Sequence, residues 1–127
     1  MKHPEYKLQK QICKYLELQY RDVVFLSDTV ANCKLTMIQA VRNKAIQKEG
    51  FKAPDLLILE PRGDYHGLFI ELKVKSPYKK NSKELLSNEH LKGQQKSITH
   101  LLNKGYYACF SVGLDETKKI IDEYMRL

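Results

Sequence analysis

The chain has 127 residues, 43% of them hydrophobic and 29% charged, a composition typical of one soluble globular domain spanning residues 1–127. No apolar run approaches the ~20 residues of a membrane span, and no signal-peptide core is present. Three cysteines without a CxxC pair argue against disulfides. We therefore expect a reduced, cytoplasmic protein with no membrane partner. The net charge of +7 favours a polyanionic partner, and the four scattered histidines exclude the usual zinc-ligand spacing.

The N-terminal segment 4–19 predicts an amphipathic helix. Pro4 suits a first turn, and side chains recur at helical spacing along one inward face. That face comprises Leu8, Ile12, Tyr15, Leu16 and Gln19. Glu5 points toward the end of the same face, and segment 22–27 then predicts a strand.

A second helix is expected at 37–49. Thr36 and Gln39 match a capping box, in which each side chain bonds the backbone N–H of the other residue. Gly50 is a typical C-terminal stop.

Two apolar strands with charged residues at defined positions follow, at 54–59 and 67–74. Asp55 opens the first strand, and Glu71 and Lys73 lie in the second. Residues i and i+2 of a strand project to the same face, roughly 7 Å apart, so the two strands would bring two carboxylates and an ammonium together. Such a group can hold a hard divalent cation and act on a phosphodiester. Glu-x-Lys occurs three times in the chain, and a purely structural ion pair is the alternative.

The C-terminal part predicts a helix at 88–103, a strand at 106–112 and a final helix capped by Asp115. Gly105 is expected to end the first of these helices. Its buried stripe comprises Leu91, Gln94, Ile98 and Leu101, with Gln95 and Leu102 alongside. The final helix is expected to turn Ile120, Ile121, Tyr124 and Met125 inward.

The predicted order is α-β-α-β-β-α-β-α, which indicates an α/β sandwich around a mixed sheet. Strands 54–59 and 67–74 are expected to form an antiparallel hairpin. A helical crossover then favours parallel or mixed pairing between 67–74 and 106–112.

A run of lysines follows the Glu71 strand within segment 76–83, which we call the lysine loop. The lysines at this end of the strand are Lys75, Lys79, Lys80 and Lys83. They are candidates for contacts with DNA phosphates, and a simply solvated loop is the equal alternative.

Glu5 and Gln94 are polar residues on stripes that are otherwise apolar. Each has an ordinary structural explanation, because a glutamate favours a helix N-terminus and a glutamine often borders a core. Both nevertheless come from helices expected to pack on the sheet that carries Asp55, Glu71 and Lys73.

Together these motifs resemble the VRR-NUC (virus-type replication-repair nuclease) family of the PD-(D/E)xK nuclease superfamily. The matching motifs are Glu5 in the first helix, Gly-x-x-x-Pro-Asp at 50–55, Glu71-Leu72-Lys73, and Leu-x-x-Gln-x-x-x-Ile at 91–98 followed by Gly-Tyr at 105–106. Ala53 stands where many members have a second glycine. Gln95 is the alternative to Gln94 as the glutamine of the helix motif, and the spacing to Gly105 favours Gln94.

The resemblance implies a restriction-endonuclease-like α-β-β-β-α-β core, with one extra helix before the Pro-Asp strand and one C-terminal helix. It implies catalytic roles for Glu5, Asp55, Glu71, Lys73 and Gln94. Mg²⁺ or Mn²⁺ would be bound by Asp55, Glu71 and the Leu72 backbone carbonyl, with Glu5 acting directly or through water. Lys73 would position the attacking water.

The function implied is a metal-dependent endonuclease for branched DNA in phage or bacterial replication, repair or recombination, acting in the host cytoplasm if phage-encoded. Stand-alone members look like homodimeric Holliday-junction resolvases. A flap, fork or nicking nuclease, an RNA-processing nuclease and a non-catalytic nucleic-acid-binding module are the alternatives. Apolar residues near the C-terminus could form a dimer interface or the core: Tyr106, Tyr107, Phe110, Ile120, Ile121, Tyr124 and Met125.

Overall fold

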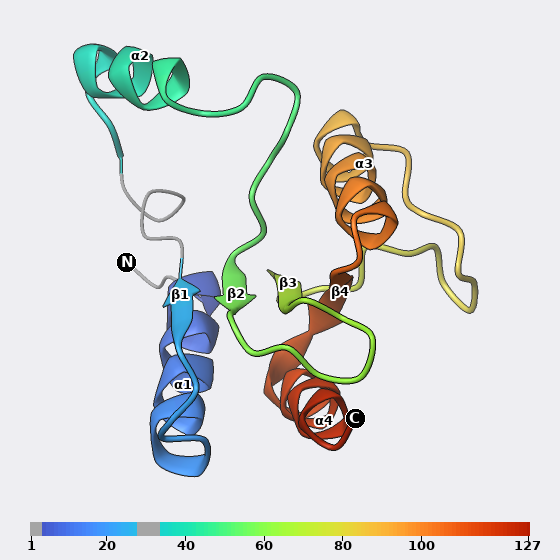
Figure 1. The fold of residues 1–127 in the computed structure, drawn as a ribbon. Helices are drawn as coiled ribbons and strands as arrows, with labels where there is room; N and C mark the ends of the chain where they lie inside the picture. The colour runs from blue at the N-terminus through green and yellow to red at the C-terminus, as the bar shows by residue number, and fades with distance from the viewer. Residues whose placement is uncertain (1–3, 28–33) are drawn as a thin grey trace.

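A computed structural model describes residues 4–27 and 34–127 as four helices and four strands within those ranges (Figure 1). In chain order they are α1 (Pro4–Gln19), β1 (Phe25–Ser27), α2 (Met37–Ala45), β2 (Leu56–Ile58), β3 (Leu68–Lys73), α3 (Glu89–Asn103), β4 (Tyr107–Val112) and α4 (Gly113–Met125). Among the described residues, no helix has the length and apolar character needed to cross a membrane.

The four strands form one mixed sheet in the order β1-β2-β3-β4. β1 pairs with β2 and β2 with β3 in antiparallel fashion, whereas β3 and β4 are parallel. The predicted hairpin and the predicted helical crossover are therefore both confirmed. So is the predicted α/β class, with an α-β-β-β-α-β core, α2 inserted before the Pro-Asp strand and α4 at the C-terminus.

The two faces of the sheet are covered by different helices. Figure 1 shows α1 and α4 below the sheet and α3 above it. The larger core lies on the α1/α4 side and consists of Leu8, Ile12, Leu16, Leu56, Ile58, Leu68, Ile70, Leu72, Ile121, Tyr124 and Met125. A smaller cluster under α3 consists of Leu91, Ile98, Leu101, Ala108 and Phe110. Alternate residues of β3 face different cores, because Leu68, Ile70 and Leu72 lie in the larger core and Phe69 packs against the smaller cluster.

The apolar C-terminal residues considered for a dimer interface are used mainly inside the molecule. Ile121, Tyr124 and Met125 are buried in the larger core, and Phe110 is buried in the smaller one. The prediction for α1 was wrong at Gln19, which is exposed, and at Tyr15, which is half-buried and donates a hydrogen bond to Asp122 of α4. Leu102, expected beside the stripe of α3, is 44% exposed.

Helix α2 begins as expected but ends early. The capping box between Thr36 and Gln39 is present in both directions, whereas the helix stops at Ala45 instead of residue 49. None of its residues is buried, so no tertiary packing extends the helix beyond the turns that its cap supports. Figure 1 shows α2 standing apart from the sheet.

Helix α4 begins earlier than predicted, and Asp115 is not its N-cap. Val112, the last residue of β4, is the N-cap and makes no side-chain capping bond. Gly113 follows directly with φ of 78°, a conformation that glycine adopts without steric cost, so the strand runs into the helix without a connecting loop. Asp115 lies in the first turn, where its charge favours the helix dipole.

Candidate active site

Strand pairing brings Asp55 and Glu71 together. Leu56 of β2 is paired with Ile70 of β3, and continuing this antiparallel register by one residue sets Asp55 opposite Glu71. The Oδ2 atom of Asp55 accepts a hydrogen bond of 2.9 Å from the backbone N–H of Leu72. This bond fixes the Asp55 carboxylate against β3, on the strand that carries Glu71.

Gln94 of α3 connects Glu71 to Lys73. Its amide Nε2 donates to Glu71 Oε1 over 2.8 Å, and its Oε1 accepts from Lys73 Nζ over 2.6 Å. Both Gln94 and Glu71 are only 6% exposed. The neutral amide of Gln94 therefore lies between the buried Glu71 carboxylate and the Lys73 ammonium and makes a charge-assisted hydrogen bond to each. Such bonds are stronger than hydrogen bonds between neutral groups.

The Lys73 ammonium has a second neighbour. It lies 5.7 Å from the ring centroid of Phe110, within the range of a cation–π interaction. Phe110 belongs to β4, which pairs with β3. The side chain of Lys73 is thus held from α3 on one side and from β4 on the other, which defines the position of its charge.

Gln95, the other glutamine considered for the Gln94 position, faces away from this cluster. It is half-buried, and its amide donates to Thr99 of the same helix over 3.3 Å. The expectation that Gln94 is the residue on the buried stripe is confirmed by its burial.

Gln9 of α1 is a buried polar residue that the sequence patterns did not single out. Its Nε2 donates to Ser27 Oγ of β1 and, over 3.4 Å, to the backbone carbonyl of Asp55. It therefore ties α1 to the start of β2. A signal was available in the sequence, because Gln9 follows Glu5 by four residues and such pairs share one face of a helix.

Glu5 lies in the first turn of α1 and is exposed, at the end of the face that carries the buried Leu8 and Gln9. Its charge nevertheless acts on the region of the site, as His90 shows. Burial lowers the pKa of His90, the charges of Lys52 and Lys73 lower it further, and Glu5 and Asp55 act in the opposite direction. Residues of α1, of β3 and of the segment before β2 therefore lie within electrostatic reach of this imidazole of α3.

Lys52 is held close to α3 just ahead of the Pro-Asp strand. Its backbone N–H donates to Ser97 Oγ over 2.9 Å, and its Nζ lies 3.1 Å from His90 Nδ1. Ser97 is buried, three residues after Gln94 on the same stripe. The segment leading to Asp55 is thus anchored on α3, a role for Ser97 and Lys52 that the sequence patterns did not reveal.

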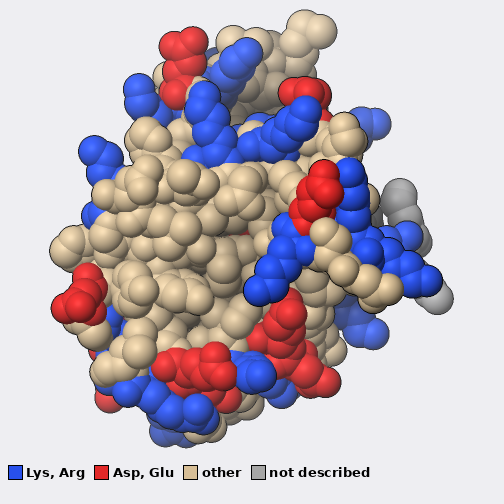
Figure 2. Space-filling view, turned by 90° about the vertical axis from the view of Figure 1, so that its right-hand side faces the viewer, with Lys and Arg blue, Asp and Glu red and all other residues tan. Residues whose placement is uncertain are grey.

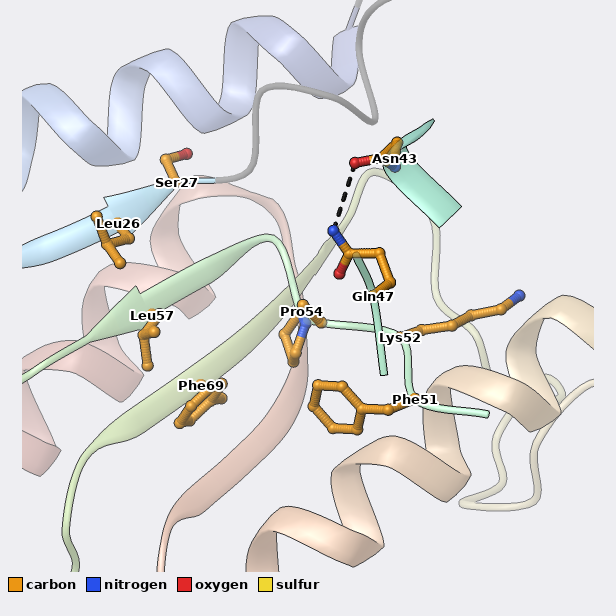
Figure 3. Close-up of a pocket in the computed structure, with 10 residues that line it drawn as sticks. Leu26, Ser27, Asn43, Gln47, Phe51, Lys52, Pro54, Leu57 and Phe69 are labelled. Carbon is orange, nitrogen blue, oxygen red and sulfur yellow. Dashed lines mark hydrogen bonds between the residues drawn. The ribbon is translucent and has the colours of Figure 1, made fainter. Parts of the chain in front are cut away.

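A pocket of about 480 Å³ opens beside this segment (Figure 3). Its wall includes Pro54, Phe51 and Phe69, and it extends to Leu26 of β1 and to the end of α2. In Figure 3, Asn43 and Gln47 are joined by a hydrogen bond on the α2 side of the pocket. Because Pro54 directly precedes Asp55, the predicted site borders a hollow rather than a closed core.

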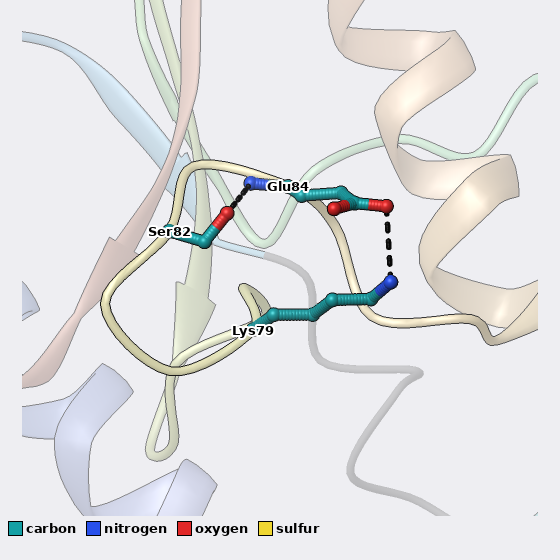
Figure 4. Close-up of polar contacts among 3 residues, drawn as sticks. All are labelled: Lys79, Ser82 and Glu84. Carbon is teal, nitrogen blue, oxygen red and sulfur yellow. Dashed lines mark hydrogen bonds and ion pairs between the residues drawn. The ribbon is translucent and has the colours of Figure 1, made fainter.

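The lysine loop is a folded turn rather than an open strand of chain. Tyr78 and Leu85 form a bridge, and the two side chains pack against the cluster under α3. Figure 4 shows that Lys79 Nζ binds Glu84 Oε1 over 2.9 Å, while Ser82 Oγ accepts from the Glu84 N–H over 2.9 Å.

The ammonium of Lys79 is thus engaged within the loop, in an exposed pair of the kind that contributes little to stability. The other candidate lysines are exposed: Lys75, Lys80 and Lys83. On the face drawn in Figure 2, Lys and Arg side chains lie near the top, right-hand and lower edges around a broad area without charged side chains, and those at the lower edge are mixed with Asp and Glu.

The donor set of the site fits a hard divalent cation. Within residues 4–27 and 34–127, no cluster of three or more His, Cys, Asp and Glu side chains forms a ready-made metal cage. Mg²⁺ does not require one, because it usually takes one or two carboxylates and completes its shell with water and substrate phosphate. Asp55 and Glu71 supply two carboxylates on neighbouring strands.

A search of solved structures finds a protein described as "VRR_NUC domain protein". It is 25% identical in sequence, the match covers 100% of this chain and 92% of that protein, and the TM-score is 0.65. This likeness over the whole chain supports membership of the VRR-NUC family. No protein-family model and no curated protein matches this sequence.

The family assignment agrees with the architecture. The chain has the mixed sheet and flanking helices of a restriction-endonuclease-like core, with Asp55 next to β2, Glu71 and Lys73 in β3 and Gln94 in α3. The predicted family and fold class are therefore both confirmed.

Proposed function

We propose that this VRR-NUC chain is a structure-specific DNA endonuclease that hydrolyses phosphodiester bonds with Mg²⁺ or Mn²⁺. The observation that best supports this is the hydrogen-bonded series from Glu71 through Gln94 to Lys73, with Asp55 alongside. Two carboxylates facing a substrate of phosphates would repel it in a protein that only bound DNA. Their presence favours catalysis over binding alone.

Each residue has a distinct part in the proposed site. Asp55 and Glu71 would hold the ion with the Leu72 backbone carbonyl, and Glu5 would support it directly or through water. When bound, such an ion supplies Lewis-acid chemistry and favours a nucleophilic water at neutral pH. Lys73 positions that water and offsets negative charge that develops on the phosphate.

Gln94 and Gln9 are positioning residues in this proposal. Gln94 sets the separation between the Glu71 carboxylate and the Lys73 ammonium. Gln9 fixes the backbone of Asp55 from α1. Catalytic groups held by packed helices and strands keep their geometry better than groups on loops.

The test is a cleavage assay with a panel of substrates: a four-way junction, a flap, a fork, a nicked duplex, a plain duplex, single-stranded DNA and RNA. We expect cleavage of branched DNA that requires added Mg²⁺ or Mn²⁺. Asp55→Asn and Glu71→Gln should abolish cleavage and leave DNA binding intact, since each removes one negative charge facing phosphate. Undiminished cleavage by chelator-treated, Mg²⁺-restored Glu71→Gln would refute the proposed site.

A homodimer acting on a four-way junction is the form of the enzyme that we propose. One hydrolytic centre cuts one strand, whereas a two-fold dimer offers two equivalent centres for paired incisions. The exposed apolar side chains that support a subunit interface are Leu26, Met37, Ile38, Val41 and Ile46. Light scattering that gives a monomer both free and on junction DNA, or single nicks without a paired cut, would favour a flap or nicking nuclease instead.

A further inference from the structure

We propose that the hollow between α2 and α3 binds the phosphate backbone of the DNA substrate on its way to the active site. This α2–α3 cleft has a volume of about 760 Å³. Its charged lining residues are Lys44, Lys48, Lys52, Lys96, Glu49 and Glu89. The inference rests on the proposed nuclease function and adds a second contact surface, separate from the lysine loop.

The cleft reaches the candidate active site through Lys52. This side chain lines the cleft, and its Nζ lies 3.1 Å from His90 Nδ1. The imidazole of His90 is in turn within electrostatic reach of Lys73 and Asp55. A phosphate backbone lying along the cleft would therefore pass from Lys44 and Lys48, at and just after the end of α2, to the residues proposed to cut it.

Gly93 shows how closely the Lys52 side chain lies against α3. Gly93 lies inside α3, where glycine is less favourable than alanine by about 1 kcal/mol. A Cβ at this position would lie 3.4 Å from Lys52 Cε and 3.5 Å from its Nζ. These distances are ordinary van der Waals contacts, so the Lys52 side chain lies along the helix at Gly93.

Charge identifies the occupant of the cleft as a polyanion. The cleft lining carries four lysines and two glutamates, so its net charge is positive. Helix α2 contributes no buried residue, and its basic C-terminal end packs against no other element in the described part of the chain. DNA carries one negative charge per ~1.7 Å of helix axis and gains affinity from every phosphate that a lysine neutralises.

The test compares two double variants with the same change in net charge. Lys48→Gln/Lys96→Gln removes two charges from the cleft without touching the proposed catalytic residues. Lys14→Gln/Lys119→Gln removes two exposed lysines from α1 and α4, on the opposite side of the sheet, and serves as the control. Binding of junction DNA is measured without divalent metal over a range of salt concentrations, and thermal unfolding checks that both variants fold.

We expect the cleft variant to flatten the slope of log K against log salt by about 1.8, because each phosphate that a lysine no longer neutralises reduces the slope by about 0.9. Between about 50 and 200 mM salt, the wild-type protein should then lose roughly 12-fold more affinity than the variant. The control variant should keep the wild-type slope. An unchanged slope in the folded cleft variant, or the same change in both variants, would overturn the proposal.

Two further measurements separate this inference from the proposed function. If the wild-type protein cuts DNA and Asp55→Asn does not, while the cleft variant binds like wild type, only the cleft proposal fails. If the wild-type protein binds DNA through the cleft but cuts none of the substrates, only the nuclease proposal fails.

Discussion

Replacing Gln94 by methionine should separate its effect on stability from its effect on catalysis. The two side chains have similar length and similar helix propensity, so the change removes mainly the amide. Both hydrogen bonds of this amide are made to charged groups, and such bonds contribute about 1.5–3 kcal/mol each. Water can hydrate the half-buried Lys73 ammonium after the change, whereas Glu71 is only 6% exposed. The expected loss in free energy of unfolding therefore comes mainly from the hydrogen bond to Glu71.

The expected loss in free energy of unfolding is therefore about 2–3 kcal/mol, which corresponds to roughly 10 °C in melting temperature for a chain of this size. The cleavage rate per folded molecule should fall by about 10–100-fold, because Lys73 loses the partner that orients it. Circular dichroism gives the melting curve, and single-turnover cleavage well below the transition gives the rate.

Gln95→Met is the matched control for this experiment. It makes the same chemical change one residue further along α3, where the amide bonds only to Thr99 among the hydrogen bonds described. Its stability should stay within about 0.5 kcal/mol of wild type, with an unchanged rate. The reasoning fails if Gln94→Met melts early but cleaves at the wild-type rate per folded molecule, since Gln94 would then be purely structural.

Lys73 and Cys109 give two further predictions. Lys73→Arg should abolish cleavage although it keeps the charge, because a planar guanidinium cannot replace a compact ammonium between Gln94 and the Phe110 ring. Single-turnover rates equal to wild type would contradict this prediction. Burial, with a smaller contribution from Glu116, raises the pKa of the Cys109 thiol from 9.0 to about 12, so its contribution to stability is complete below pH 9 and is lost as the pH rises toward 12. Urea unfolding should show the stability difference between wild type and Cys109→Ala shrinking over that range, and a constant difference would contradict the assignment.

The sequence predicted the elements whose signals are local and periodic. Helix α1 has the expected limits because Pro4 and an apolar repeat define it, and the capping box of α2 forms because its two partners are three residues apart. Glu71 and Lys73 could be placed on one face because side chains of a strand alternate, and Gln94 was recognised as a polar residue on an apolar stripe.

Other features depend on contacts between segments that are distant in the chain. The carboxylate of Asp55 is fixed by a backbone N–H of β3, and Gln9 bonds to Asp55 across 46 positions in the sequence. Ser97 anchors the backbone of Lys52 across 45 positions. Periodicity within one element says which face a residue occupies, but it does not say which partner lies opposite.

The early end of α2 and the direct passage from β4 into α4 were likewise decided by the tertiary structure. Propensity favours a longer α2, and only the lack of packing shows why it stops at Ala45. The order of the motifs along the chain thus predicted the family and the set of candidate residues. Their joint geometry was decided by strand register and helix packing, because hydrogen bonds between elements form only where folding brings those elements together.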